Sequence, residues 1–217
     1  MTAQTGPTTS PPSTPPVADK FAASEAHAAV HAAAIEAVGA KLGDALIETS
    51  AFRGETTLVV GRERILEILV LLRDDPATQL NRLSDLTAVD YLDLGREPRF
   101  AVVYHLMSRT NYARLRVRAQ VPEDDPWIDS VTRFYPSANW QEREVFDLFG
   151  IGFRGHPDLK RILLPDDWDG HPLRKDFPIG AEEVEFSFNH EVIEAERPQT
   201  PSEREERYRL ARPVNNF

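Results

Sequence analysis

The chain has 217 residues and a formal net charge of −10, from 25 Lys and Arg against 35 Asp and Glu. This length suffices for one domain with a substantial core, and so acidic a surface argues against nucleic acid as a main partner, because phosphate binding needs a basic field. The chain contains no cysteine, which excludes disulfides, thiolate nucleophiles, and cysteine-ligated zinc or iron–sulfur clusters in this polypeptide.

Both ends of the chain have the composition of unstructured tails. We take residues 1–20 as a disordered tail, because residues 1–16 contain five Pro, seven Ser or Thr and no charge. Residues 181–217 carry nine Glu against five Arg, which indicates a second, acidic and solvated extension. The remainder divides into an α+β domain over residues 21–138 and a helix with a docking arm over residues 139–180.

Hydrophobic periodicity predicts the elements of the α+β domain in order. Helices are expected over Ala22–Leu42 and Arg62–Arg73, where apolar residues recur at helical spacing. Strands are expected over Asp44–Thr49, Glu55–Val60, Leu86–Tyr91, Arg99–Met107 and Tyr112–Val121. The longest apolar run, Ile65–Leu72, is interrupted by Glu67 and is far too short to cross a bilayer. The fold class is therefore α+β: a mixed, mainly antiparallel sheet with flanking helices, followed by an extended Pro-rich C-terminal arm.

Two histidines on the first expected helix, His27 and His31, lie four residues apart and share a face on which a metal ion could be held. A zinc protease also needs Glu directly after the first His, and Ala28 stands there. Both rings fall in the apolar arc of the helix. We therefore interpret them as partly buried packing residues and expect no metal site.

A row of basic residues, Arg114, Arg116 and Arg118, alternates with apolar residues in the last expected strand. Such a row could hold an acidic partner or phosphates. The alternative is the solvated outer face of an edge strand, where charge discourages wrong pairing. Because no other basic patch accompanies the row, we favour the edge-strand interpretation.

A third helix is expected from Asn139 to the residue before Gly150. Asn139 followed three residues later by Glu142 is typical of a capping box, and Gly150 is a natural C-terminal stop. Arg143 and Asp147 lie one turn apart and are expected to form an ion pair.

Two carboxylates of this helix, Glu142 and Glu144, are flanked by aromatic and aliphatic residues. Carboxylates in apolar surroundings must find partners or take up a proton. An enzymatic interpretation makes them a general acid and base, with His156 nearby, in a free-standing hydrolase. No nucleophile or substrate-pocket motif accompanies them, so we favour a structural role at an interface.

The segment that follows is expected to be an extended arm. Four prolines, at 157, 165, 172 and 178, exclude a long helix or a central strand, yet the segment is rich in Leu, Ile, Trp and Phe. An arm with so much apolar surface normally wraps another surface. His156 and His171 could instead join the nearby aspartates in a metal site, but their spacing matches no compact ligand motif.

This part of the chain resembles the signature of one family. It reads Glu142-Arg143-Glu144, two residues, Asp147-Leu148-Phe149, six residues, His156, three residues, Lys160, then Ile162-Leu163. The run Leu164–Pro178 resembles the same family. The family is the 30 kDa subunit, also called the C subunit, of the proton-pumping NADH–quinone oxidoreductase, respiratory complex I. Its members occur separately or fused to a neighbouring subunit, and this chain resembles the separate form.

The resemblance implies a non-redox architectural subunit of the peripheral arm, on the cytoplasmic side of the cell membrane. The whole complex couples electron transfer from NADH to quinone with proton translocation. Family members hold no cofactor, whereas FMN and iron–sulfur clusters belong to partner subunits.

The partners that the resemblance implies are other subunits of complex I. The chief one is the D subunit, which shapes the quinone pocket, and the other is the B subunit, which holds the last iron–sulfur cluster. We refer to them as the quinone-pocket subunit and the last-cluster subunit. Membrane contact is implied only through the complex. The related subunit of a membrane-bound hydrogenase looks similar over the same residues and stays as an alternative.

We expect the subunit interface to include twelve residues of the helix and arm, and we expect no catalytic, cofactor-binding or metal-binding residue in this chain. The expected interface residues are Glu142, Arg143, Glu144, Asp147, His156, Lys160, Arg161, Trp168, His171, Arg174, Lys175 and Asp176.

Overall fold

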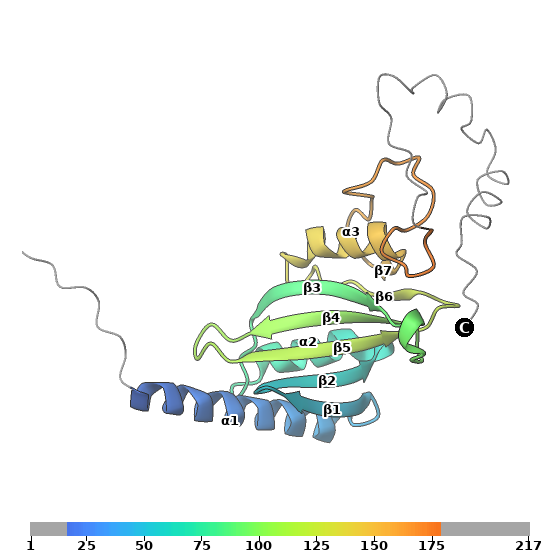
Figure 1. Cartoon of the computed structure of the whole chain (residues 1–217). Helices are drawn as coiled ribbons and strands as arrows, with labels where there is room; N and C mark the ends of the chain where they lie inside the picture. Colours follow the sequence, from blue (N-terminus) through green and yellow to red (C-terminus); the bar gives the residue numbers. More distant parts are fainter. Residues whose placement is uncertain (1–16, 179–217) are drawn as a thin grey trace, which may run out of the picture.

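The structure, a computed structural model, describes residues 17–178 (Figure 1). Its helices are α1 (Val17–Leu42), α2 (Ile65–Asp74) and α3 (Ala138–Phe149), with the short 3-10 helices η1 (Arg62–Arg64) and η2 (Leu92–Leu94). Its strands are β1 (Leu46–Phe52), β2 (Glu55–Gly61), β3 (Arg82–Asp90), β4 (Phe100–Met107), β5 (Arg114–Val121), β6 (Trp127–Asp129) and β7 (Gly152–Arg154).

The five long strands form one sheet in the order β1-β2-β5-β4-β3, and β6 and β7 form a separate parallel pair. All neighbours in the large sheet are antiparallel except β2 and β5, which run parallel. The predicted α+β class with a mixed, mainly antiparallel sheet is confirmed. The turn between β1 and β2 uses Arg53 and Gly54, both with positive φ, a pairing typical of tight hairpins.

The expected termini agree only in part with the described structure. Residues 1–16 and 179–217 lie outside the described residues. Helix α1 begins at Val17, five residues before its predicted start, so residues 17–20 belong to a helix and not to the tail. Its buried stripe of Val30, Ala34 and Val38 matches the predicted apolar face.

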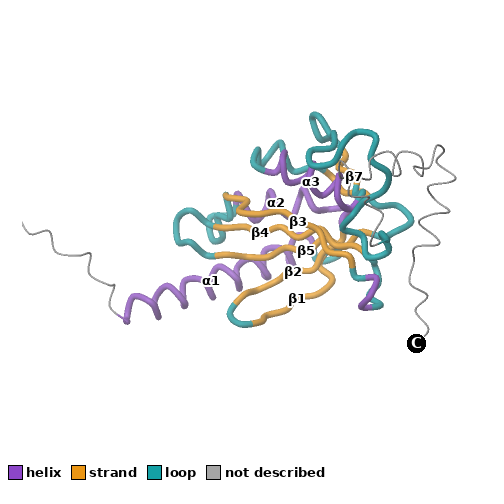
Figure 2. Tube along the Cα trace, turned by 45° about the horizontal axis from the view of Figure 1, so that its top comes forward, coloured by secondary structure: helices purple, strands orange, loops and turns teal. Residues whose placement is uncertain are grey.

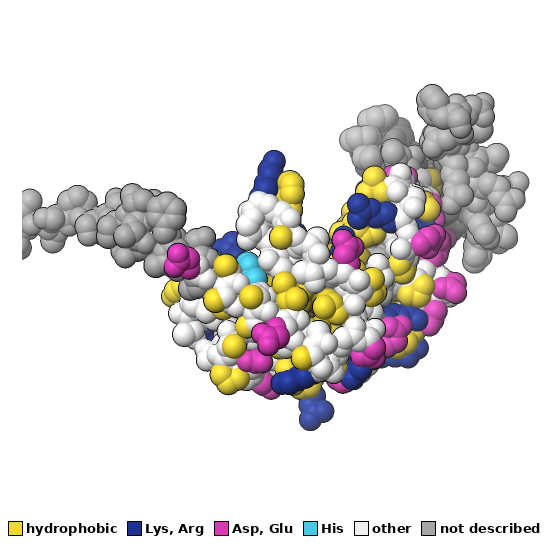
Figure 3. Space-filling model, turned by 90° about the horizontal axis from the view of Figure 1, so that it is seen from below, with side chains coloured by type: hydrophobic (Ala, Val, Ile, Leu, Met, Phe, Trp, Pro, Cys, Tyr) yellow, Lys and Arg dark blue, Asp and Glu magenta, His cyan; other side chains and the backbone are white. Residues whose placement is uncertain are grey.

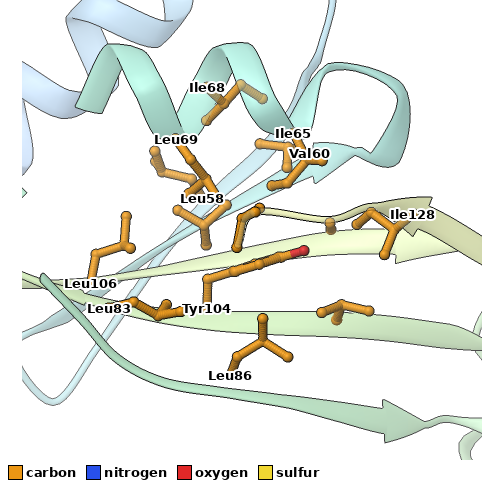
Figure 4. Packing of buried hydrophobic residues seen from close by; sticks show 14 of the residues in the cluster. Leu58, Val60, Ile65, Ile68, Leu69, Leu83, Leu86, Tyr104, Leu106 and Ile128 are labelled. Atoms are coloured by element: carbon orange, nitrogen blue, oxygen red, sulfur yellow. The ribbon is translucent and has the colours of Figure 1, made fainter. Parts of the chain in front are cut away.

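The core lies between α2 and one face of the large sheet. Figure 4 shows Ile65, Ile68 and Leu69 of α2 pointing toward Leu58 and Tyr104 of the sheet. All of these side chains are fully buried. The same cluster extends beyond the sheet to Ile128, Val131, Tyr135, Ala138, Val145, Phe149, Ile151 and Phe153. The segment after β5 therefore completes the core of the domain.

The row of arginines lies at the centre of the sheet. Strand β5 carries Arg114, Arg116 and Arg118, and it pairs with β2 on one side and β4 on the other. The alternation is as predicted, because Leu115 and Val117 are buried on the opposite face. The edge-strand interpretation is wrong, since a parallel partner from earlier in the chain covers the free edge of the hairpin.

The two histidines of α1 hold the helix against the β4–β5 hairpin. His27 Nε2 lies 3.1 Å from the carbonyl oxygen of Asn111, and His31 Nε2 lies 2.7 Å from that of Arg114. Since a carbonyl oxygen only accepts, each ring donates its Nε2 proton. Over residues 17–178, no group of three or more His, Asp or Glu has the arrangement of a metal site.

The segment after β7 folds back over α3. In Figure 1 it runs as an orange loop above α3, and Figure 2 shows the same loop beside α3 and β7. None of the helices within residues 17–178 combines the length and apolar character that a membrane crossing requires. The face of the molecule seen from below mixes hydrophobic, acidic and basic side chains (Figure 3).

Candidate functional site

Helix α3 begins without a capping side chain. Ser137 occupies the N-cap position with helical φ and ψ and makes no side-chain capping bond, and Asn139 already lies inside the helix. The predicted capping box from Asn139 to Glu142 is therefore wrong. Its physical reason is that the Glu142 side chain points into the protein, where it finds other donors.

Glu142 is a fully buried carboxylate at the core side of α3. Its Oε1 accepts the backbone N–H of Val131 at 2.7 Å, and its Oε2 accepts the hydroxyl of Ser130 at 2.6 Å. These bonds attach α3 to the segment after β6. Burial outweighs both bonds and raises the pKa of Glu142 from its ordinary 4.5 to about 7.

The hydroxyl of Tyr104 is a second buried polar group in this region. It is fully buried and finds no hydrogen-bond partner among the described residues. Burial, with the nearby carboxyls of Glu142 and Asp129, holds the pKa of Tyr104 well above its ordinary value. The core beneath α3 therefore contains a carboxyl and a phenol with few donors between them.

Asp147, on the side of α3 that faces the arm, is also fully buried but is fully satisfied. Its Oδ2 accepts three successive backbone N–H groups of the arm, from Ile162 at 3.0 Å, Leu163 at 2.8 Å and Leu164 at 3.0 Å. Its Oδ1 accepts Arg161 Nη1 at 2.8 Å. Burial alone would raise the pKa of Asp147, but these donors outweigh it and lower the pKa to about 2.

Arg143 does not pair with Asp147, and that prediction is wrong. Its guanidinium donates to the carbonyl oxygens of Lys160 at 3.1 Å and Arg161 at 3.0 Å, and it lies 5.2 Å from the centre of the Trp140 ring. The reason is that Arg161, from the arm, occupies the position beside Asp147. Arg143 instead holds the arm by its backbone.

The C-terminal end of α3 is closed by two side chains of the arm. His171 Nδ1 donates to the carbonyl of Asp147 at 2.8 Å, and Arg174 Nε donates to that of Phe149 at 2.6 Å. Gly150 permits this approach. It has a φ of 70°, and a Cβ there would overlap the His171 ring and lie 2.7 Å from Arg174 Nη2. Gly150, predicted as the helix stop, is thus also the position against which His171 and Arg174 of the arm pack.

The far end of the arm is joined to the sheet by an ion network centred on a buried pair, Asp90 and Arg99. Arg99, between β3 and β4, donates to Asp90 at 2.7 Å, to Asp176 of the arm at 2.7 Å and to Glu123 at 2.5 Å. The backbone N–H of Lys175 donates to Asp90 Oδ2 at 2.9 Å. Burial alone would raise the pKa of Asp90, but Arg99 and the backbone N–H groups of Lys175 and Leu92 outweigh it and lower the pKa.

Sequence reasoning missed the buried pair of this network, Asp90 and Arg99. The signal was present, since Asp90 ends one apolar strand and Arg99 directly precedes the next. Opposite charges at the joined ends of two adjacent buried strands are well placed to pair across them. Nothing in the local pattern, however, indicates Asp176 as the third member.

His156 attaches the beginning of the arm to the beginning of α3. Its Nε2 donates to the carbonyl oxygen of Asn139 at 3.2 Å, and its Nδ1 accepts the N–H of Asp158 at 3.1 Å. Lys160 forms an exposed ion pair with Asp158 at 3.0 Å. Trp168 contributes its carbonyl oxygen to Arg161 Nη2 at 3.0 Å, whereas its indole Nε1 is buried without a partner among the described residues.

The residues of the hydrolase alternative do not converge. Glu142 is buried and bonded to Ser130 and Val131, whereas Glu144 is exposed. Two residues apart on a helix, the two side chains point in nearly opposite directions. The prediction that Glu144 lies in apolar surroundings within this chain is therefore wrong. Both ring nitrogens of His156 are engaged with the backbone.

The arm therefore forms many of its backbone hydrogen bonds with its own chain, mainly with side chains of α3. Of the twelve predicted interface residues, Glu142 and Asp147 are covered by atoms of the same chain. Glu144, Lys160 and Lys175 are exposed, and the other seven are half-buried. Three large apolar side chains of α3 and the arm also remain exposed, Trp140 at 63%, Leu163 at 63% and Leu173 at 47%.

The chain matches a protein family described as "Respiratory-chain NADH dehydrogenase, 30 Kd subunit" over residues 58–183. A protein of Roseiflexus sp. (strain RS-1), named as the C subunit of NADH-quinone oxidoreductase, is 52% identical over 164 residues, which are 76% of this chain and 93% of that protein. A Geobacter sulfurreducens protein of the same name is 49% identical over 67% of this chain and 88% of its own length.

Two solved structures are also similar. The trypsin-resistant fragment (1–134) of Nqo5 is 40% identical, with a TM-score of 0.46 over 55% of this chain and 93% of that one. A chain in the structure of the membrane-bound sulfane sulfur reductase, an archaeal respiratory membrane complex, is 24% identical. Its TM-score is 0.56 over 77% of this chain and 91% of that one, a similarity of fold.

Proposed function

Because this chain belongs to the 30 kDa subunit family of respiratory-chain NADH dehydrogenase, the family of the C subunit of NADH–quinone oxidoreductase, we propose that it is a non-redox architectural subunit of that enzyme. The enzyme carries electrons from NADH to quinone, and in our proposal this chain supports that transfer and the coupled proton translocation only by holding partner subunits. The observation that carries the proposal is the family match over more than half of the chain.

The chemistry of the chain supports a role without a redox centre of its own. It has no cysteine, so it offers no thiolate to an iron–sulfur cluster. The acidic and basic groups of the candidate site are used to fix the arm to α3 and to the sheet. We therefore assign FMN and the iron–sulfur clusters to partner subunits.

The exposed side of α3 and the arm is the surface that we assign to the partners. We call it the α3–arm face and define it by Trp140, Glu144, Leu163 and Leu173. Large exposed aromatic and aliphatic side chains beside charged ones are typical of interface anchors with a polar rim. We propose that the quinone-pocket subunit covers this face and that the last-cluster subunit lies nearby. Glu142 and Asp147, covered by their own chain, act there only by positioning the helix and the arm.

We propose further that the chain lies on the cytoplasmic side of the cell membrane and reaches the membrane only through the complex. Purification from native membranes tests the assignment. Co-elution of the chain with flavin, iron–sulfur absorbance and NADH:quinone activity is expected. Hydrogen-dependent reduction in the same fraction would instead favour the hydrogenase alternative, and elution of the chain alone would contradict both.

The α3–arm face is tested by removing its anchors. The double substitution Trp140→Ala with Leu163→Ala is expected to weaken binding of the purified quinone-pocket subunit by at least about tenfold, since a buried interface Trp typically contributes more than 1 kcal/mol. The matched control is Phe52→Ala with Leu94→Ala, two apolar side chains that are 72% and 68% exposed elsewhere on the molecule. Equal binding by both variants would remove the α3–arm face from the interface.

A further inference from the structure

The face of the large sheet opposite α2 carries a row of polar and charged side chains from four neighbouring strands. In Figure 1 the strands face the viewer, with α2 behind them. Cross-strand register places Thr57, Arg116, His105 and Asp85 side by side across β2, β5, β4 and β3. An antiparallel sheet commonly packs one face on the core and leaves the other face to solvent. This polar face is therefore open to a partner, and its shape and charge determine which partner it can bind.

One end of this face is hollowed. A cavity of about 500 Å³ lies where the β4–β5 hairpin meets β3, and its walls include Arg82, Arg114, Arg116, His105, Asp85 and Glu55. The register of β3 against β4 shifts between Leu83 and Asp85 beside the hollow. The volume matches that of ordinary binding pockets, and it suits a few side chains of another polypeptide.

The charges of the hollow are only partly balanced within the chain. Arg116 pairs with Glu55 and lies 3.4 Å from the hydroxyl of Thr57. The carboxylate of Asp85 accepts its neighbour's N–H at 3.0 Å and the side chain of Gln141 at 3.1 Å. Arg82 and Arg114, by contrast, form no ion pair within residues 17–178. Two exposed guanidinium groups are thus left at the rim.

His105 adds a neutral hydrogen-bonding group to the wall. It is half-buried and, among residues 17–178, makes no hydrogen bond through its ring. Burial and the neighbouring Arg116 lower its pKa, so the ring is neutral near pH 7 and can both donate and accept. A ligand with carboxylates can therefore form ion pairs with Arg82 and Arg114 and accept a hydrogen bond from the ring of His105.

We propose that this hollow binds an acidic segment of a neighbouring subunit, whose carboxylates pair with Arg82 and Arg114. Guanidinium groups hold carboxylates in bidentate pairs, which fixes orientation as well as adding affinity. A long polyanion is disfavoured because the whole chain carries a charge of −10, whereas a short acidic segment meets the local positive charge. The inference rests on the proposed function, because it requires a neighbouring subunit.

The assembled complex provides the first test. A photoreactive benzoylphenylalanine placed at Ser84, an exposed residue of the hollow, is expected to cross-link a peptide of another subunit that carries several Asp or Glu residues. The inference is overturned if the cross-linked peptide is neutral or basic, if it comes from residues 181–217 of this chain, or if no cross-link forms. The same photoreactive group at Trp140 reports on the proposed function separately. If Trp140 cross-links other subunits and Ser84 does not, only the assignment of the hollow fails.

The isolated full chain provides the second test. Binding of a synthetic ten-residue peptide of alternating Glu and Ala to this chain is measured by fluorescence anisotropy in low salt. We expect this acidic peptide to bind more tightly than a matched peptide of alternating Lys and Ala. The double substitution Arg82→Glu with Arg114→Glu should weaken that binding by about tenfold or more. Arg96→Glu is the control, because Arg96 is exposed in the loop between β3 and β4 and does not line the hollow. Equal binding of both peptides, or equal loss in both variants, would contradict the inference.

Discussion

Glu142 and Asp147 lie five residues apart on α3, and both carboxylates are fully buried, but they differ in what the surrounding chain supplies. Glu142 faces the core and accepts two hydrogen bonds, and its pKa rises to about 7. Asp147 faces the arm and accepts three backbone N–H groups and Arg161, and its pKa falls to about 2.

This difference shows that burial alone does not set the state of a carboxyl group. Taking a carboxylate out of water favours the protonated form, and only enough correctly placed donors reverse that preference. The arm provides such donors because its backbone turns tightly around Asp147, whereas the segment after β6 provides one N–H and one hydroxyl to Glu142. The arm side of α3 is therefore ionic, and the core side is close to neutral.

The largest effect is expected where the arm side meets the sheet, at Arg99. Arg99→Met leaves Asp90 buried without its guanidinium, which typically costs about 3–5 kcal/mol of the free energy of unfolding. Chemical denaturation measures this change. The double variant Asp90→Asn with Arg99→Met should recover a large part of the loss, and Arg96→Met is the exposed control. If Arg99→Met lowers the free energy of unfolding by less than about 1 kcal/mol, the network does not hold the arm to the sheet.

The attachment of the arm to α3 is tested most directly at Asp147. Asp147→Ala removes the acceptor of three N–H groups and the partner of Arg161, and we expect a loss of about 3 kcal/mol. Hydrogen exchange should show lost protection at the amides of residues 162–164, with the strands of the large sheet unchanged. Asp166→Ala, in an exposed part of the arm, is the control. Retained protection at residues 162–164 would contradict this description of the arm.

Acidification should reproduce part of this effect in the unmodified chain. The pKa of Asp147 is about 2 in the folded state against an ordinary 3.8. A lowered pKa adds stability that is fully present above pH 4 and is lost as the pH falls toward 2. The amides of residues 162–164 should therefore lose protection in that interval before those of the sheet.

The core side of α3 should respond to pH in the opposite direction. The pKa of Glu142 is about 7 when folded and 4.5 ordinarily, so the folded state is favoured below pH 4.5 and loses stability as the pH rises to 7. Glu142→Gln removes the charge, while its amide oxygen can still accept the Val131 N–H and its NH2 group can donate to the Ser130 hydroxyl oxygen in place of accepting from it. Its advantage over the unmodified chain should grow to about 2–3 kcal/mol above pH 7. The free energy of unfolding between pH 4 and 8 measures it. Glu144→Gln, exposed on the same helix, should show no such trend, and a flat difference for Glu142→Gln would contradict the assignment.

The smallest effect is expected at Arg143. Its guanidinium donates to two carbonyl oxygens at the partly exposed junction of α3 and the arm, so Arg143→Ala should cost about 1 kcal/mol or less. Thermal unfolding measures this. Asp147 keeps all its donors in this variant, and its pKa should stay low. A loss as large as that of Asp147→Ala would mean that Arg143 supports Asp147 after all.

Much of the body of the fold follows from short-range pattern. The alternation in β5 and the helical spacing in α2 gave the correct element types, because each element buries one face of its own repeat. The position of β5 at the centre of the sheet, however, could not be predicted from local pattern. Its neighbour β2 lies more than fifty residues earlier, and no local rule indicates that a parallel strand will cover the edge of a hairpin.

The candidate site divides in the same way. The signature motif on α3 and the arm indicated the family, which the family match bears out, and Gly150 was recognised as a helix stop. The pairing of those residues was not predictable. Helical spacing favoured Arg143 for Asp147, but the arm presented Arg161 and three N–H groups from fourteen or more residues away.

The amino-acid sequence by itself determined the three α-helices and five long strands to within a few residues, the absence of thiolate chemistry, and membership of the family, because each depends on residue type and near spacing. Only the tertiary structure decided which carboxylate keeps its charge, which cation it meets, and that the arm lies on its own α3. The physical reason is that the charge state of a buried group depends on every donor within a few ångströms, and these donors come from parts of the chain that local spacing does not connect.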